Sequence, residues 1–411
     1  MNISPNFSPP LQIMKPYFLL SGFFYMLSMF GIFFININTD IKDFELIGWV
    51  HLYILGFVMM AIFASMAQLG AIVVESEHYN VKVFKYVWIF LTTGLLLMLW
   101  GFYIDVSALV YGGFLVLIAM SMYAIEFILT LKNARRKTSI TNAMKMSNFF
   151  LLLGIITGLA MALAFNGFLN FNPHNILNTH TFGLVVGFVI LLIMGISIVL
   201  IPMFGFSKRV SDNEFQNSFI TLSVGVSLMM LSPFLYTDIL QNIAYTITTI
   251  AFVLYFFQLY KMNISRKKIE HDIWAKSMYI GFSSFILSSI ILLAYLFFQD
   301  ETNLKLGMWI MLIGFFGFLI MGNFYKIIPF LIWFQVYSPL IEEQSVPMLH
   351  ELLDKKLSNL QWIYSSFGFI LSSLAILQNN QQLFKGGIIL LSVGSVLFFL
   401  IILKIIKTHI K

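Results

Sequence analysis

Long apolar runs alternate with short polar stretches along the whole chain. Each run holds about 20 residues, the length that an α-helix needs to cross the hydrocarbon core of a bilayer. The pattern predicts an all-α polytopic membrane protein of about twelve transmembrane helices. The runs cover approximately 16–36, 47–74, 85–104, 107–131, 147–167, 177–206, 217–236, 239–260, 274–298, 306–334, 361–378 and 384–406.

The composition agrees with this pattern. Of the 411 residues, 59% are hydrophobic and only 10% are charged, and a soluble chain of this length could not hide so much apolar surface. The lipid bilayer is therefore the expected environment. The stretch from Met1 to Pro16 is polar and the run after it is long enough to span, so no cleavable signal peptide is expected. The chain has no cysteine, which excludes disulfides and thiolate metal sites.

Basic residues predict the orientation of the helices, because they stay on the cytoplasmic side. Alternate loops are rich in lysine and arginine, whereas the opposite loops hold only Lys42, Lys305 and Lys385. Both termini are therefore expected to be cytoplasmic. The net charge of +6 reflects this asymmetry and does not indicate nucleic-acid binding.

A segment that begins with Gly-Phe occurs three times, at Gly56, Gly187 and Gly314. In the last two copies a second glycine and a proline follow at the same offsets. We expect one transmembrane domain over 1–411, with three parallel pseudo-repeats of four helices at about 15–135, 145–262 and 272–408. A cytoplasmic loop is expected at about 335–360, with a short surface helix at 348–357.

Two histidines lie just before these segments, His51 before the first and His180 before the second. Haem iron takes a neutral histidine nitrogen, and copper also favours imidazole. His51 and His180 are the candidate cofactor-binding residues, and His174, in the preceding loop, joins them as a candidate metal ligand. The alternative is that each is a hydrogen-bonded core or interfacial histidine and that no cofactor binds.

The other polar candidates are weaker. We interpret His78, His271, His350 and His409 as solvated loop histidines. Glu126 is interpreted as a side chain that reaches to the interface, with a proton-path carboxylate as the alternative. Glu75, Glu77 and His78 have the composition of a metal site but are expected at an exposed helix end.

The third Gly-Phe segment resembles the tenth helix of the haem-copper oxidase catalytic subunit. The matching residues are Ile313-Gly314-Phe315-Phe316-Gly317-Phe318, Gly322, Phe324-Tyr325 and Ile328-Pro329. The C-type oxidases and the NnrS-type proteins look most similar. The resemblance implies twelve helices in three arcs, with His51 at the place of a haem ligand and His180 near that of a copper ligand. The tenth-helix haem ligands are replaced by Gly307 and Trp309, and the copper histidines have no counterpart in 218–236.

The resemblance implies a bacterial cytoplasmic (inner) membrane protein that binds haem b or copper. Its expected role is that of an accessory in respiration or nitrosative-stress defence, with respiratory-chain proteins as partners. Because the active-site ligands are missing, oxidase turnover and an enzymatic activity are not expected. Two alternatives stay open: a permease for a small solute, and a non-catalytic assembly subunit of a respiratory complex.

Overall fold

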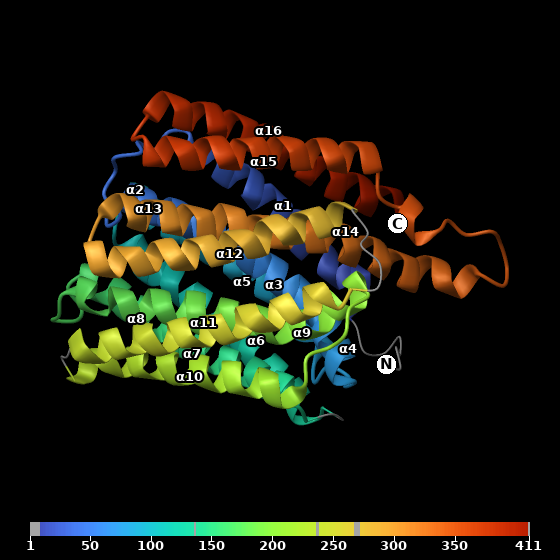
Figure 1. Ribbon diagram of the computed structural model, residues 1–411, viewed down its shortest axis with the longest axis horizontal. Coiled ribbons are helices and arrows are strands. Elements are labelled where there is room, and N and C mark those ends of the chain that lie inside the picture. The colour runs from blue at the N-terminus through green and yellow to red at the C-terminus, as the bar shows by residue number, and fades with distance from the viewer. Residues whose placement is uncertain (1–8, 135–136, 236–237, 267–271, 410–411) are drawn as a thin grey trace. The chain divides into compact units, whose positions relative to one another are not determined.

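The computed structural model describes residues 9–134, 137–235, 238–266 and 272–409, and every element in these ranges is helical (Figure 1). Within them, twelve helical stretches are long and apolar enough to cross a membrane. This confirms the predicted all-α, multi-pass architecture. The stretches are Leu11–Ile32, Phe44–Val74, Val81–Tyr103, Ala108–Lys132, Ser139–Phe165, Pro173–Gly205, Asp212–Leu235, Ile239–Ile264, Ile273–Phe298, Glu301–Leu340, Lys355–Leu377 and Gln381–Thr408.

The chain forms two compact units. Unit 1 comprises Met1–Pro9 and Met66–Ile269, and unit 2 comprises Pro10–Ser65 and Glu270–Lys411. The described elements of unit 1 are η3 (Met66–Gly70), α4 (Ala71–Val74), η4 (Val81–Val83), α5 (Phe84–Tyr103), α6 (Ala108–Lys132), α7 (Ser139–Phe165), η5 (Pro173–Ile176), α8 (Leu177–Thr181), η6 (Phe182–Ile190), α9 (Leu191–Gly205), α10 (Asp212–Leu235) and α11 (Asp238–Ile264).

Unit 2 holds the first spanning helix, the larger part of the second and the last four. Its described elements are α1 (Leu11–Ile32), α2 (Phe44–His51), η2 (Leu52–Met59), α3 (Met60–Ser65), α12 (Ile273–Phe298), α13 (Glu301–Trp309), η7 (Ile310–Gly317), α14 (Phe318–Ile332), η8 (Trp333–Tyr337), η9 (Ser338–Leu340), η10 (Leu349–Glu351), α15 (Lys355–Leu377) and α16 (Gln381–His409). The division into three repeats is a different partition of the chain and stays a prediction, as does the orientation of the termini.

Long π-helical stretches interrupt three of the spanning helices. They are η2, η6 and η7, and each contains one of the Gly-Phe pairs, at Gly56, Gly187 and Gly314. π-Helical turns are rare and frequently occur at functional sites. In each of the three helices, the residues that precede the π-helical stretch form a short α-helix, which is α2, α8 or α13.

In both units, the two helices of a hairpin pack closely at glycine residues. α15 and α16 run side by side in Figure 1, and a Cβ atom added to Gly368 would lie 2.7 Å from the backbone nitrogen of Leu391. In unit 1, a Cβ on Gly94 of α5 would lie 3.0 Å from the carbonyl oxygen of Gly112 on α6. Small residues let helix backbones approach this closely, which replaces the hydrophobic driving force that lipid does not supply.

Aromatic side chains fill the core of unit 2. The rings of Trp49 and Trp309 stack with centroids 5.9 Å apart, and Tyr53 continues the column 5.8 Å from Trp49. Both indole nitrogens donate hydrogen bonds, that of Trp49 to the carbonyl of Ser28 and that of Trp309 to the hydroxyl of Ser372. Trp309 is therefore a core residue whose indole nitrogen has a hydrogen-bond partner.

The chain between α14 and α15 differs from the prediction. Helix continues through η8 and η9 to Leu340, into the expected loop, and the expected surface helix at 348–357 is a single 3₁₀ turn, η10, followed by the start of α15 at Lys355. Asp354 caps α15 by accepting a hydrogen bond from the backbone N–H of Leu357. That bond and a second one from the Lys404 ammonium lower the pKa of Asp354, so the cap is the charged carboxylate at neutral pH.

Candidate functional site

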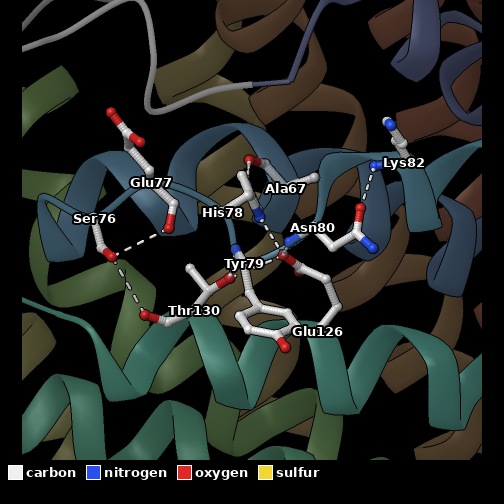
Figure 2. Close-up of polar contacts among 9 residues, drawn as sticks. All are labelled: Ala67, Ser76, Glu77, His78, Tyr79, Asn80, Lys82, Glu126 and Thr130. Atoms are coloured by element: carbon white, nitrogen blue, oxygen red, sulfur yellow. Dashed lines mark hydrogen bonds and ion pairs between the residues drawn. The ribbon is translucent and has the colours of Figure 1, made fainter.

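A buried hydrogen bond joins the ionisable side chains of His78 and Glu126 within unit 1 (Figure 2). The imidazole Nδ1 lies 2.9 Å from the carboxylate Oε1, and both side chains are only 1% exposed. This distance is that of a well-formed hydrogen bond. A charge held inside a membrane protein is costly, so ionisable residues in such places are usually functional.

Two elements bring the partners together. Glu126 points from α6, six residues before that helix ends at Lys132. His78 belongs to the loop formed by residues 75–80, which begins where Glu75 takes the left-handed conformation (φ 52°) and ends α4. Gly70 allows the neighbouring helix to approach α6, because a Cβ atom there would lie 2.7 Å from the ring of Phe127.

Both ring nitrogens of His78 contact an oxygen atom. Nε2 lies 2.7 Å from the carbonyl oxygen of Ala67 in η3, and a carbonyl oxygen can only accept. Oε1 of Glu126 already accepts from the backbone N–H of Asn80 (3.3 Å) and from the hydroxyl of Thr130 (2.9 Å). The Thr130 oxygen is itself an acceptor for the N–H of Tyr79 (3.0 Å). Nε2 therefore donates its proton to the Ala67 carbonyl, and a single proton lies between Nδ1 and Oε1, on the imidazole in an ion pair or on the carboxyl in a neutral pair.

The second carboxyl oxygen of Glu126, Oε2, differs from Oε1 in its hydrogen bonding. Glu126 Oε2 is buried and has no hydrogen-bond partner among the described residues. A buried polar atom without a partner needs an explanation, such as a catalytic role, a water molecule or an ion. The pair is neutral overall, and Oε2 is the atom that can take one more proton without disturbing the contacts of Oε1.

The structure places the predicted cofactor ligands in different units. His51 ends α2 in unit 2, and its Nδ1 lies 2.8 Å from the carbonyl oxygen of Ile47. His180 lies on α8 in unit 1, with Nδ1 2.9 Å from the carbonyl oxygen of Gly154. The ring of His180 rests against Gly158, where an added Cβ would lie 2.5 Å from the imidazole. Whether His51 and His180 share a site stays a prediction.

His174 is exposed in η5, and its ring lies edge-on to Phe165. In the part of the chain that the structure describes, no group of three or more histidine, aspartate or glutamate side chains is close enough to hold a metal ion. The trio of Glu75, Glu77 and His78 is therefore not assembled as a metal site there. The assignment of His174 as a metal ligand stays a prediction.

Two interpretations from the sequence are wrong. The side chain of His78 is not solvated but buried, and the side chain of Glu126, expected to extend to solvent at the membrane surface, is buried against His78. The sequence could not predict this burial, because it depends on a tertiary contact between residues 48 positions apart. The one hint in the sequence is Thr130, one turn after Glu126, where a hydroxyl can serve the carboxylate. His350 is exposed as expected, whereas His271 and the side chain of His409 lie outside the described residues.

No protein-family model and no curated protein matches the chain.

Proposed function

We propose that this chain is a proton-coupled membrane transporter of a small solute, with the His78–Glu126 pair as its proton-binding site. The observation that carries the proposal is the buried carboxylate of Glu126, one oxygen of which has three partners while the other has none among the described residues. Carboxylate and histidine side chains of this kind form the proton relays of pumps and transporters.

The geometry gives proton binding a physical consequence. With Oε2 unprotonated, the pair has no net charge, and a proton at Oε2 leaves one positive charge in a buried site. In a low-dielectric interior, this added charge interacts strongly with the surrounding groups and so changes the free energy of the conformation that holds it. A change in charge at a buried site is the type of event that biases a two-state structure. Proton binding is therefore suited to drive alternation between conformations.

Replacing Glu126 with glutamine tests this proposal, because the amide keeps the shape and one acceptor oxygen but cannot take the proton. We expect infrared difference spectra between acidic and alkaline buffer to lose a carboxylic acid band in Glu126→Gln. We also expect proton uptake by vesicles that hold the protein and a trapped pH-sensitive dye to fall to the level of protein-free vesicles. Glu77→Gln is the matched control, because Glu77 is an exposed carboxylate on the neighbouring loop. Unchanged uptake in Glu126→Gln contradicts the proposal.

A haem- or copper-linked role in respiration or nitrosative-stress defence is the second candidate, and the histidine geometry favours it. In both His51 and His180, Nδ1 faces a backbone carbonyl, so Nδ1 carries the proton and Nε2 the lone pair. Metal-ligating histidines commonly have this arrangement. Through Nε2, His51 or His180 would hold a haem b or a copper ion, and the bound group would supply electron transfer. This role matches the expected bacterial inner membrane location and respiratory-chain partners.

Optical spectra test the haem-linked role. We expect the reduced-minus-oxidised spectrum of protein from haem-replete cells to show a b-type band that His51→Ala or His180→Ala removes, because each change deletes the imidazole nitrogen that would hold the haem. His174→Ala is the control, since its ring is exposed and should leave the spectrum unchanged. A colourless preparation without copper contradicts a cofactor-linked function.

We also infer that the chain consists of three parallel four-helix repeats. Two features support this architecture. A π-helical stretch surrounds the Gly-Phe pair in each of the three segments. The third and fourth helices of each repeat form a hairpin with a glycine at the contact: Gly94 and Gly112 in α5 and α6, Gly225 in α10, and Gly368 and Gly387 in α15 and α16.

A further inference from the structure

The connections between the helices of unit 1 differ in charge at its two ends. At one end, the connections 133–138 (α6 to α7) and 206–211 (α9 to α10) contain lysine and arginine and no acidic residue. At the other end, the connections 104–107 and 166–172 contain no lysine or arginine, and Asp105 is their only ionisable residue. One end of the unit is thus positively charged where its spanning helices end.

A hydrogen-bonded contact brings the two basic connections together. Asp212, the first residue of α10, accepts hydrogen bonds from the backbone N–H (3.0 Å) and the hydroxyl (2.8 Å) of Ser139, the first residue of α7. Lys137 lies two residues before Ser139, and Lys208 and Arg209 lie four and three residues before Asp212. Because lysine and arginine side chains are long and flexible, those of both connections can reach one anion at this contact.

The cations at this contact are not neutralised by acidic side chains. Lys137, Lys208 and Arg209 are exposed, and none of them forms an ion pair with another residue that the structure describes. Of the two acids in the first turn of α10, Asp212 binds the start of α7 and Glu214 pairs with a lysine of α11. Three positive charges therefore face the single negative charge of Asp212, and the surface keeps a positive excess.

Exposed apolar side chains come directly before the cations of the second connection. Every residue of α9 from Leu191 to Pro202 is buried, whereas Met203 is 39% exposed and Phe206 is 56% exposed. Phe206 takes the left-handed conformation (φ 52°) that ends α9. Phenylalanine beside lysine and arginine is typical of protein surfaces that lie between the headgroups and the acyl chains of a bilayer. The end of α9 therefore offers apolar and cationic contacts side by side.

We propose that Lys137, Lys208 and Arg209 bind the headgroup of an anionic phospholipid, with Met203 and Phe206 against its acyl chains. Lysine and arginine form charge-assisted hydrogen bonds with phosphate oxygens, and basic pockets between membrane helices bind anionic headgroups. A zwitterionic phospholipid has the same phosphate, but its ammonium group would add to the positive charge already present. The surface should therefore select lipids with a net negative charge. This site is separate from the proposed proton-binding site and does not depend on it.

Native mass spectrometry of the full chain in detergent, with added phosphatidylglycerol or phosphatidylcholine, tests the proposal. We expect the wild type to retain phosphatidylglycerol in preference to phosphatidylcholine. The test variant combines Lys137→Gln, Lys208→Gln and Arg209→Gln. We expect its apparent affinity for phosphatidylglycerol to fall by about five-fold for each charge removed, while its affinity for phosphatidylcholine stays unchanged. The matched control removes three charges from the opposite loops, in the variant Lys42→Gln, Lys305→Gln and Lys385→Gln, and should keep the preference.

The outcomes distinguish a lipid site from a general effect of net charge. An unchanged preference in the test variant, or an equal loss in the test and control variants, overturns the proposal. Displacement of phosphatidylglycerol by an equal concentration of inorganic phosphate would assign the cations to a free anion and overturn the lipid assignment. Because the three side chains are exposed, the test variant should unfold at the same temperature as the wild type in lipid-free detergent. If it does not fold, the single variant Arg209→Gln gives the same comparison with one charge removed.

Discussion

Replacing Glu126 with alanine is expected to lower the free energy of unfolding by about 3–5 kcal/mol, the typical cost of removing one partner of a buried ion pair. The imidazole of His78, only 1% exposed, would lose its carboxyl partner and stay buried. The hydroxyl of Thr130 and the N–H of Asn80 would lose their shared acceptor as well. Thermal unfolding of the purified protein in detergent, compared with the wild type, measures the effect.

The matched control removes both charges. In the double variant His78→Phe with Glu126→Leu, two apolar side chains of similar volume replace the pair, and such replacements are often neutral or stabilising. We expect the double variant to be more stable than either single variant, His78→Phe or Glu126→Leu, which gives a clear coupling between the positions in a double-mutant cycle. If the stability losses of the two single variants add up to the loss of the double variant, His78 and Glu126 do not stabilise the protein through their interaction.

The spanning helices could be predicted from the sequence because the bilayer imposes both their length and their apolar character. The run expected at 47–74 is found as Phe44–Val74, and that at 107–131 as Ala108–Lys132. The helix ends were less predictable, since they depend on local contacts. The tenth span continues to Leu340 because a π-helical turn at Trp333–Tyr337 extends it, and the indole of Trp333 donates a hydrogen bond to the carbonyl of Pro347.

The His78–Glu126 site could not be predicted from the sequence. His51 and His180 stand out because they precede the Gly-Phe segments at similar offsets. His78 belongs to no repeated pattern, and a loop histidine next to two glutamates is ordinarily solvated. Its burial depends on the turn at Glu75, on the close approach at Gly70 and on an acceptor 48 residues away on α6. These are tertiary contacts, and neither periodicity nor composition encodes them.

The second large effect is expected at the contact between α15 and α16. A Cβ atom on Gly387 would lie 2.6 Å from the backbone nitrogen of Ser372 and 3.0 Å from the carbonyl oxygen of Gly368. Backbone atoms cannot rotate away as a flexible side chain can, so Gly387→Ala would force the two helices apart. Overpacking of this kind costs about 1–3 kcal/mol. We expect a lower thermal unfolding temperature for Gly387→Ala in detergent.

The adjacent glycine provides the control on the same helix. A Cβ on Gly386 would meet only the side chain of Leu371, at 3.7 Å, which is an ordinary contact. Gly386→Ala should therefore stabilise the helix by about 0.5–1 kcal/mol, because alanine has a higher helix propensity than glycine. We expect a higher unfolding temperature for this variant. The two substitutions are chemically identical and one residue apart, so opposite signs can come only from the close approach at Gly387. Equal effects would show that the α15–α16 contact has room for a methyl group and that close approach does not hold the hairpin together.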